Sequence, residues 1–144
     1  MRQMNEEQGI SRRTAICALS LIGVGVFTSA ESAVAATGVK VLSNGKVQVT
    51  IKSNPALKKV GGVVRIDDVK GRSIALVRTS TKAYTAVNLL CTHQGGALFQ
   101  SGNQWQCDVH GATFTLAGKN LVGPATTALK QLPVKATASV VTIG

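Results

Sequence analysis

The chain has 144 residues, enough for one domain, and its formal net charge is +10. Aromatic residues make up only 3%, so the core must be built from Val, Leu, Ile and Ala. A charge this large favours an anionic partner such as nucleic acid, an anionic surface or an acidic protein. With one Trp and one Tyr, the chain has no series of aromatic residues for stacking bases, so nucleic-acid binding is not expected.

Residues 1–35 have the pattern of an export signal. Arg12 and Arg13 precede an apolar run at residues 15–27, and Ala33-Val34-Ala35 forms an A-x-A cleavage pattern before Ala36. The paired arginines resemble a twin-arginine signal, which predicts export to the periplasm or the cell-surface side of the cytoplasmic membrane. The alternative is an uncleaved segment that anchors the domain, although residues 14–30 are at the short end of what spans a bilayer.

The predicted domain, residues 36–144, retains the whole net charge, because residues 1–35 contain three basic and three acidic residues. Alternating Val47, Val49 and Ile51 predict a strand over residues 46–52, followed by a loop at residues 53–55. Further strands are expected at residues 62–66, 74–78, 84–90, 98–100, 103–106, 112–116 and 139–143, with turns at glycines 71, 102, 118 and 123. No stretch has helical periodicity, so an all-β fold is expected.

The candidate site consists of two short segments that contain both histidines and two of the three cysteines. They are Cys91-Thr92-His93 and Cys107-Asp108-Val109-His110, whereas Cys17 lies in the apolar run of the signal. In an exported protein, two structural cysteines would be expected to form a disulfide. A disulfide would leave both histidines unexplained, so the pattern favours metal binding.

The spacing of these residues bears on the type of metal centre. Structural zinc sites usually take two ligands from each of two knuckles around one ion. In a Rieske centre one iron takes two Cys and the other takes two His, so each segment can give a Cys to one iron and a His to the other. Spacing favours the iron–sulfur centre, and a Cys2His2 zinc-stabilised binding module remains the alternative from another class.

From about residue 60 to residue 143 the sequence resembles the Rieske [2Fe–2S] domain family. Its two loop motifs, C-T-H-x-G and C-x-x-H-G-x-x-F, are matched at residues 91–95 and 107–114, and its G-P-A segment is matched at residues 123–125. The resemblance implies an antiparallel β-sandwich or barrel with a two-loop cluster-binding subdomain. It also implies one [2Fe–2S] cluster per chain, held by Cys91, His93, Cys107 and His110.

The sequence departs from the family at four positions. Rieske proteins of cytochrome bc complexes usually have a further cysteine in each loop, joined as a disulfide, but those positions here are Gly96 and Val109. High-potential members have a serine and a tyrosine that donate hydrogen bonds to cluster sulfurs, where this chain has Ala112 and Phe114. Such bonds stabilise the reduced cluster, so their loss predicts a potential in the lower half of the roughly −150 to +300 mV range of Rieske centres.

The resemblance implies single-electron transfer by a small exported Rieske protein or by the small subunit of a redox complex. A quinol-oxidising cytochrome bc-type subunit is the alternative, and the missing disulfide and missing donors disfavour it. No catalytic site of its own is expected, because both histidines are used as ligands and a Rieske oxygenase needs a separate iron site. The expected partner is a redox protein, with an acidic one favoured by the net charge.

Overall fold

The computed structural model describes residues 34–144, so the predicted export signal lies outside the described residues except for its last two positions. Residues 34–144 contain no α-helix, and no helix among them is long and apolar enough to cross a membrane. It contains one 3-10 helix, η1 (Pro55–Lys58), and thirteen strands. These are β1 (Val34–Ala35), β2 (Val39–Val41), β3 (Val47–Thr50), β4 (Val63–Ile66), β5 (Ile74–Arg78), β6 (Tyr84–Asn88), β7 (Leu98–Ser101), β8 (Gln104–Cys107), β9 (Thr113–Thr115), β10 (Asn120–Val122), β11 (Gln131–Leu132), β12 (Val134–Ala136) and β13 (Val140–Ile143).

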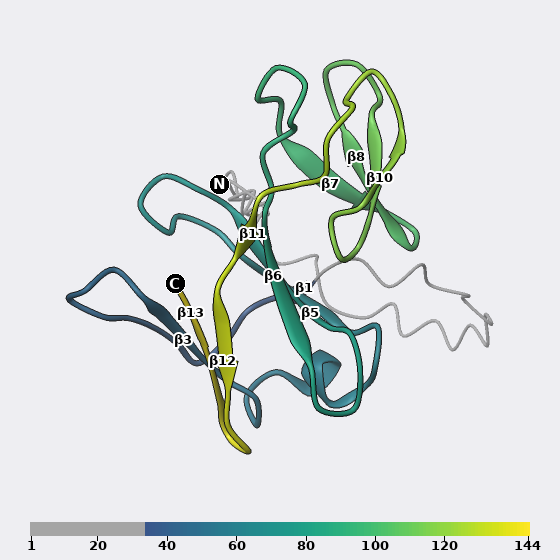
Figure 1. Cartoon of the computed structure of the whole chain (residues 1–144). Helices are drawn as coiled ribbons and strands as arrows, with labels where there is room; N and C mark the ends of the chain where they lie inside the picture. Colours follow the sequence, from purple (N-terminus) through teal and green to yellow (C-terminus); the bar gives the residue numbers. More distant parts are fainter. Residues whose placement is uncertain (1–33) are drawn as a thin grey trace, which may run out of the picture.

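The strands form three sheets (Figure 1). The base sheet has the order β12-β13-β3-β2, the middle sheet β1-β4-β5-β6-β11, and the loop sheet β10-β9-β8-β7. Strand pairs are antiparallel apart from β1 with β4. The predicted all-β antiparallel fold is therefore confirmed.

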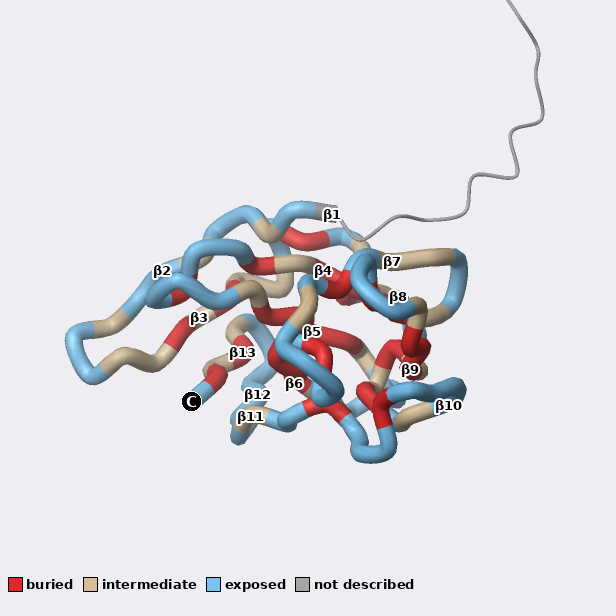
Figure 2. The backbone as a smooth tube through the Cα atoms, turned by 90° about the horizontal axis from the view of Figure 1, so that it is seen from above, coloured by how far each residue is buried: buried red, intermediate tan, exposed pale blue. Residues whose placement is uncertain are grey.

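The middle sheet is buried on both faces. In β5 the first four residues are all buried, instead of alternating between buried and exposed. Leu76 packs in one buried cluster with Val47 and Val49 of the base sheet, and Ala75 packs in another with Trp105 of the loop sheet. Because successive strand residues point to opposite faces, the middle sheet joins the two others into one body (Figure 2).

The predicted strands correspond to β3 to β9 and β13, with boundaries that differ by up to two residues. The two- and three-residue strands β1, β2, β10, β11 and β12 were not predicted, because they are too short to show alternation. A loop was predicted where η1 begins.

The short strand β1 includes residues that the sequence analysis assigned to the export signal. Val34 and Ala35 pair with Val64 and Arg65, and the Ala36 N–H donates to the Arg65 carbonyl at 2.8 Å. The division into a signal at residues 1–35 and a domain at residues 36–144 stays a prediction.

The side chain of Arg65 links the middle sheet to the loop sheet by a hydrogen bond. One guanidinium N–H donates to the carbonyl of Leu98 in β7 at 2.8 Å, and Nε donates to Asp67 at 2.8 Å. Asp67 also accepts the Ser73 hydroxyl at 2.6 Å. These two bonds, that from Ser73 first and that from Arg65 second, lower the pKa of Asp67, so its carboxylate is charged near neutral pH.

Replacing Arg65 should weaken the attachment of the loop sheet. In Arg65→Met the Leu98 carbonyl loses its partner, and we expect the free energy of unfolding to fall by about 1–3 kcal/mol. Chemical denaturation of the holoprotein measures this change. Arg72→Met alters an exposed arginine whose side chain makes no hydrogen bond or ion pair within residues 34–144, and it should change stability by less than about 0.5 kcal/mol. Equal losses in the two variants would contradict the assigned role of Arg65.

Candidate metal centre

The first loop, residues 91–96, follows β6 and closes through two backbone hydrogen bonds at Cys91. The Cys91 carbonyl accepts the Gly95 N–H at 2.9 Å, and the Cys91 N–H donates to the Gly96 carbonyl at 2.8 Å. The bridge between Leu90 and Ala97 joins the two ends of the loop. The chain therefore reverses within six residues around Cys91.

The second loop, residues 107–112, repeats this arrangement between β8 and β9. The Cys107 carbonyl accepts the Gly111 N–H at 3.2 Å, and the Cys107 N–H donates to the Ala112 carbonyl at 2.8 Å. Gly95 and Gly111 both have φ of +73°, a conformation that side chains disfavour. The glycines of C-T-H-x-G and C-x-x-H-G are therefore required by the backbone of each loop.

The two loops bring the two thiols together in the interior. Cys91 and Cys107 are buried, are not joined in a disulfide, and hydrogen-bond to each other through their side chains. Each sulfur also accepts hydrogen bonds from the backbone N–H groups two and three residues further along the chain. In the second loop the donors are Val109 and His110.

The pKa values of the two thiols are shifted in opposite directions. Burial raises the pKa of Cys91, and the neighbouring Cys107 adds to this effect. Burial acts in the same sense on Cys107, but the N–H groups of Val109 and His110 stabilise its thiolate and lower its pKa overall. The backbone donors of the second loop therefore favour the thiolate form of Cys107.

The histidines of the two loops lie together at the surface. The ring centroids of His93 and His110 are 4.9 Å apart, with the rings at 80° to each other. Both residues are exposed, in contrast to the buried cysteines. The four residues predicted to be ligands are thus sorted into an inner thiol pair and an outer imidazole pair.

This sorting fits a two-iron centre better than a single ion. A Cys2His2 zinc site would need four ligands around one ion, whereas a Rieske centre needs one pair for each of two irons. The pairs present could hold such a cluster, with the cysteines on the inner iron and the histidines on the outer.

The turn at Gly102, which the sequence predicts, sets the register of the second loop. Ser101 pairs with Gln104 across a two-residue turn, and the same ladder places Cys107 opposite Leu98. The chain between the two loop motifs therefore returns through a tight hairpin.

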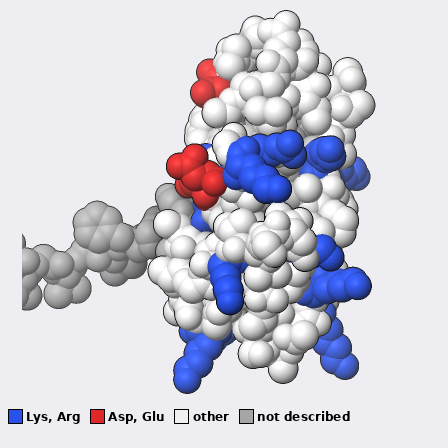
Figure 3. Space-filling model, turned by 90° about the vertical axis from the view of Figure 1, so that its left-hand side faces the viewer, with Lys and Arg blue, Asp and Glu red and all other residues white. Residues whose placement is uncertain are grey.

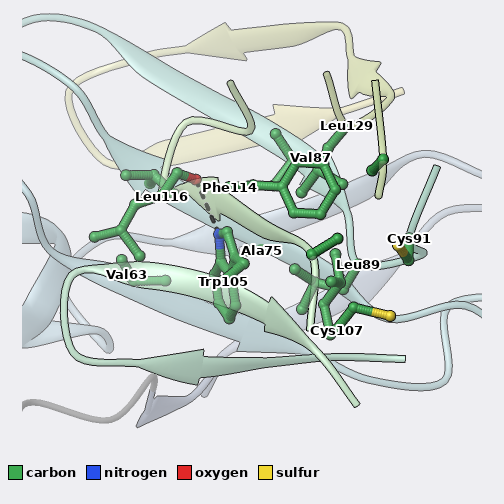
Figure 4. Packing of buried hydrophobic residues seen from close by; sticks show 14 residues of the cluster. Val63, Ala75, Val87, Leu89, Cys91, Trp105, Cys107, Phe114, Leu116 and Leu129 are labelled. Atoms are coloured by element: carbon green, nitrogen blue, oxygen red, sulfur yellow. Dashed lines mark hydrogen bonds between the residues drawn. The ribbon is translucent and has the colours of Figure 1, made fainter. Parts of the chain in front are cut away.

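Both cysteines belong to a buried apolar cluster. Trp105 is fully buried, and its indole N–H donates to the Leu116 carbonyl at 3.1 Å (Figure 4). The same cluster contains both cysteines and Phe114. Trp105 is thus a core residue that also packs beneath the site.

A third segment, residues 123–129, packs against the first loop. Ala125 and Leu129 are buried in the same cluster as the cysteines, as the G-P-A match implies. The Thr92 hydroxyl donates to the Thr127 carbonyl at 2.8 Å, and the Asn120 amide donates to the Ala125 carbonyl at 2.8 Å. The roles of Thr92 and Asn120 could not be predicted from the sequence, because only the fold shows which carbonyl each can reach.

The positions of the absent disulfide lie against each other. A Cβ atom added at Gly96 would be 2.7 Å from Val109 Cγ2 and 2.7 Å from Cys107 Sγ. Gly96 therefore lets the second loop approach the first without a side chain between them. Ala112 and Phe114 are fully buried, and neither side chain can donate a hydrogen bond.

The charge is distributed unevenly over the molecule. Residues 83–118, which include both loops, contain no Lys or Arg, and their only acidic residue is Asp108. Figure 3 accordingly shows Lys and Arg across the middle and lower parts of one face, while the upper end is almost free of them. The histidines lie in a segment without basic side chains.

Comparison with known proteins identifies the family. The sequence model of the Rieske [2Fe-2S] domain matches residues 45–133, more than half of the chain. No curated protein sequence matches the chain. The chain belongs to the Rieske [2Fe-2S] domain family, its cofactor is a [2Fe–2S] cluster, and its general function is electron transfer.

Solved structures support this assignment. The chain is similar to the cyanobacterial plasma membrane Rieske protein PetC3 from Synechocystis PCC 6803, with 27% identity and a TM-score of 0.51 over 60% of this chain and 90% of that one. It shares a fold with the quaternary ammonium Rieske monooxygenase CntA, at 22% identity and a TM-score of 0.52. That match covers 63% of this chain and 30% of the monooxygenase chain.

Adding a methyl group at position 96 should disturb the centre. In Gly96→Ala the new carbon would collide with Cys107 Sγ, and we expect overpacking to cost about 1–3 kcal/mol and to reduce iron and sulfide per purified chain. Gly123→Ala is the matched control, because its added Cβ would have its nearest neighbour at 4.0 Å. Full cluster content in Gly96→Ala would show that the two loops are further apart than described.

Removing the Thr92 hydroxyl should loosen the first loop. Thr92→Val loses the bond to Thr127, worth about 1 kcal/mol, so a chelator should remove iron roughly fivefold faster. The loss of visible absorbance with time measures this rate. Thr126→Val changes an exposed threonine with no recorded hydrogen bond in residues 34–144, and it should release iron at the wild-type rate. Equal rates in both variants would contradict the assigned role of Thr92.

Proposed function

We propose that this chain is an exported single-electron carrier or the small subunit of a redox complex, with its cluster held by Cys91, His93, Cys107 and His110. The observation that carries the proposal is the buried thiol pair beneath an exposed imidazole pair. When bound, the cluster supplies a site that accepts and releases one electron.

The protein groups have separate roles in this proposal. The two thiolates hold the inner iron, and their four backbone N–H donors stabilise negative charge on the sulfurs. His93 and His110 hold the outer iron through one ring nitrogen each, and each presents its other nitrogen to solvent or to a partner.

The partner would meet the chain at the histidines. Their surroundings include the exposed apolar side chains of Leu90 and Val109, which directly precede Cys91 and His110 in the sequence. A contact there would include these apolar side chains and no Lys or Arg from residues 83–118. The predicted attraction to an acidic partner would therefore act through the basic middle and base of the molecule and would weaken with salt.

Export to the periplasm or the cell-surface side of the cytoplasmic membrane rests on the sequence of residues 1–35, with membrane attachment if that segment is retained. The similarity to a plasma membrane Rieske protein supports a location at that membrane. Against a cytochrome bc-type role stand Gly96, where the loops leave no room for a side chain, and the absent donors at Ala112 and Phe114.

The ligand assignment predicts a defined spectroscopic outcome. Dithionite-reduced protein should give a Rieske EPR signal with an average g value below that of the free electron. His93→Ala and His110→Ala should each abolish that signal, because the outer iron loses one of its two protein ligands. Gln94→Ala, which alters a neighbouring exposed side chain, should retain it. Colourless wild-type protein containing one zinc per chain would overturn the assignment.

The missing donors predict a midpoint potential in the lower half of the roughly −150 to +300 mV range of Rieske centres, and a value above about +200 mV would contradict this. Restoring a hydroxyl in Ala112→Ser should raise it by about 60 mV, because a hydrogen bond stronger by about 1.4 kcal/mol in the reduced state corresponds to about 59 mV. Redox titration followed by circular dichroism measures both values. Ala86→Ser, at a buried alanine of the middle sheet that packs toward the base sheet, should leave the potential unchanged.

A further inference from the structure

A basic cleft lies beside the first loop, apart from the four proposed ligands. It has a volume of about 550 Å³ and takes its lining from β4, the turn between β4 and β5, the first loop and Lys130. Three of the lining residues are cationic, namely Arg65, Arg72 and Lys130, and none is acidic. Figure 3 shows Lys and Arg gathered across the middle of one face of the molecule.

The cations of this cleft differ in how far their charge is compensated. Arg65 pairs with Asp67 and donates to Leu98, so its guanidinium is held in place. Arg72 and Lys130 are exposed, and no ion pair or side-chain hydrogen bond is recorded for either within residues 34–144. Two uncompensated positive charges therefore share one concave surface, which focuses the field and attracts anions.

The cleft also offers a neutral donor. Asn88, which is 8% exposed, also lines it, and its side-chain amide carries two N–H donors. Guanidinium, ammonium and amide N–H groups together form a donor set suited to carboxylate or phosphate oxygens.

We infer that this cleft binds a small anion with two or more acidic oxygens, such as a phosphate or a polycarboxylate. Its volume lies within the roughly 300–1,000 Å³ range of small-molecule sites. Arg72 can donate two parallel hydrogen bonds to such a group, and Lys130 adds the second uncompensated positive charge. The site goes beyond electron transfer and does not depend on which partner receives the electron.

The position of the cleft couples this anion to the cluster. Its lining includes Leu90, Gly95 and Ala97, which form and join the ends of the loop around Cys91. A bound anion places negative charge beside a centre that gains negative charge on reduction, so the reduced protein should bind the anion more weakly. By reciprocity, the anion should lower the midpoint potential, and a tenfold difference in affinity corresponds to about 59 mV.

Binding is tested with the oxidised holoprotein, by calorimetric titration with inorganic phosphate and, in a second arm, citrate. Chloride keeps the ionic strength constant and serves as the monovalent control. We expect saturable binding of at least one of the two anions, weakened at least tenfold in Arg72→Gln and Lys130→Gln. Lys119→Gln and Lys135→Gln remove the same charge outside the cleft and should bind within twofold of wild type.

Two outcomes of this titration would overturn the site. One is the absence of saturable binding for both phosphate and citrate. The other is an equal loss of affinity in the control variants, which would mean general attraction to a basic protein. Tighter binding of phosphate would identify a phosphate as the ligand class, and tighter binding of citrate would identify a polycarboxylate.

Redox titration of the holoprotein with and without the bound anion tests the coupling. If the reduced form binds the anion threefold more weakly, the midpoint potential should fall by about 28 mV, because a tenfold difference in affinity corresponds to about 59 mV. Lys130→Gln should show a smaller shift at the same anion concentration. Equal potentials with and without the anion in wild-type protein would overturn the coupling, whatever the electron-transfer partner.

Discussion

The structure depends on two short loops that reverse the chain around a cysteine in the same way. In each, the cysteine carbonyl accepts the N–H of the glycine four residues later, and the cysteine N–H donates to the carbonyl five residues later. This closure turns the N–H groups that follow each cysteine toward its sulfur. It also leaves the histidine of each loop at the surface. The inner and outer ligand pairs are thus a result of backbone hydrogen bonding.

The rest of the fold holds these loops in position without a disulfide. The middle sheet packs against the loop sheet through one apolar cluster, and that cluster extends to both cysteines. Arg65 joins the two sheets at Leu98, and Thr92 joins the first loop to Thr127. Each of these bonds is individually weak, so the stability of the centre is shared among several contacts and the cluster itself.

The sequence was sufficient to predict the all-β class, the main strands and the hairpin turn before the second cysteine. Those elements have strong local signals, such as alternating valines at Val47 and Val49 and a Ser-Gly-Asn turn. The four candidate ligands could be identified because no other Cys or His lies in the predicted domain. The structure adds that these ligands separate into a buried and an exposed pair.

Other features could not be predicted because they depend on contacts between distant residues. Both faces of β5 are buried, because the base sheet covers one and the loop sheet covers the other. The bond from Thr92 to Thr127 spans 35 residues, and that from Arg65 to Leu98 spans 33. The cleft of Arg65, Arg72 and Lys130 likewise combines residues from separate segments, which a linear count of charges cannot reveal.

The segregation of charge gives the molecule a permanent electric dipole. Its positive pole lies toward the middle and base, and the histidines lie in the part that has no basic side chains. In the field of an anionic surface such a dipole experiences a torque that turns the basic end inward before contact. The imidazole pair would then face away from that surface. Orientation of the electron-exchanging end would therefore be set at long range, and high salt would remove it.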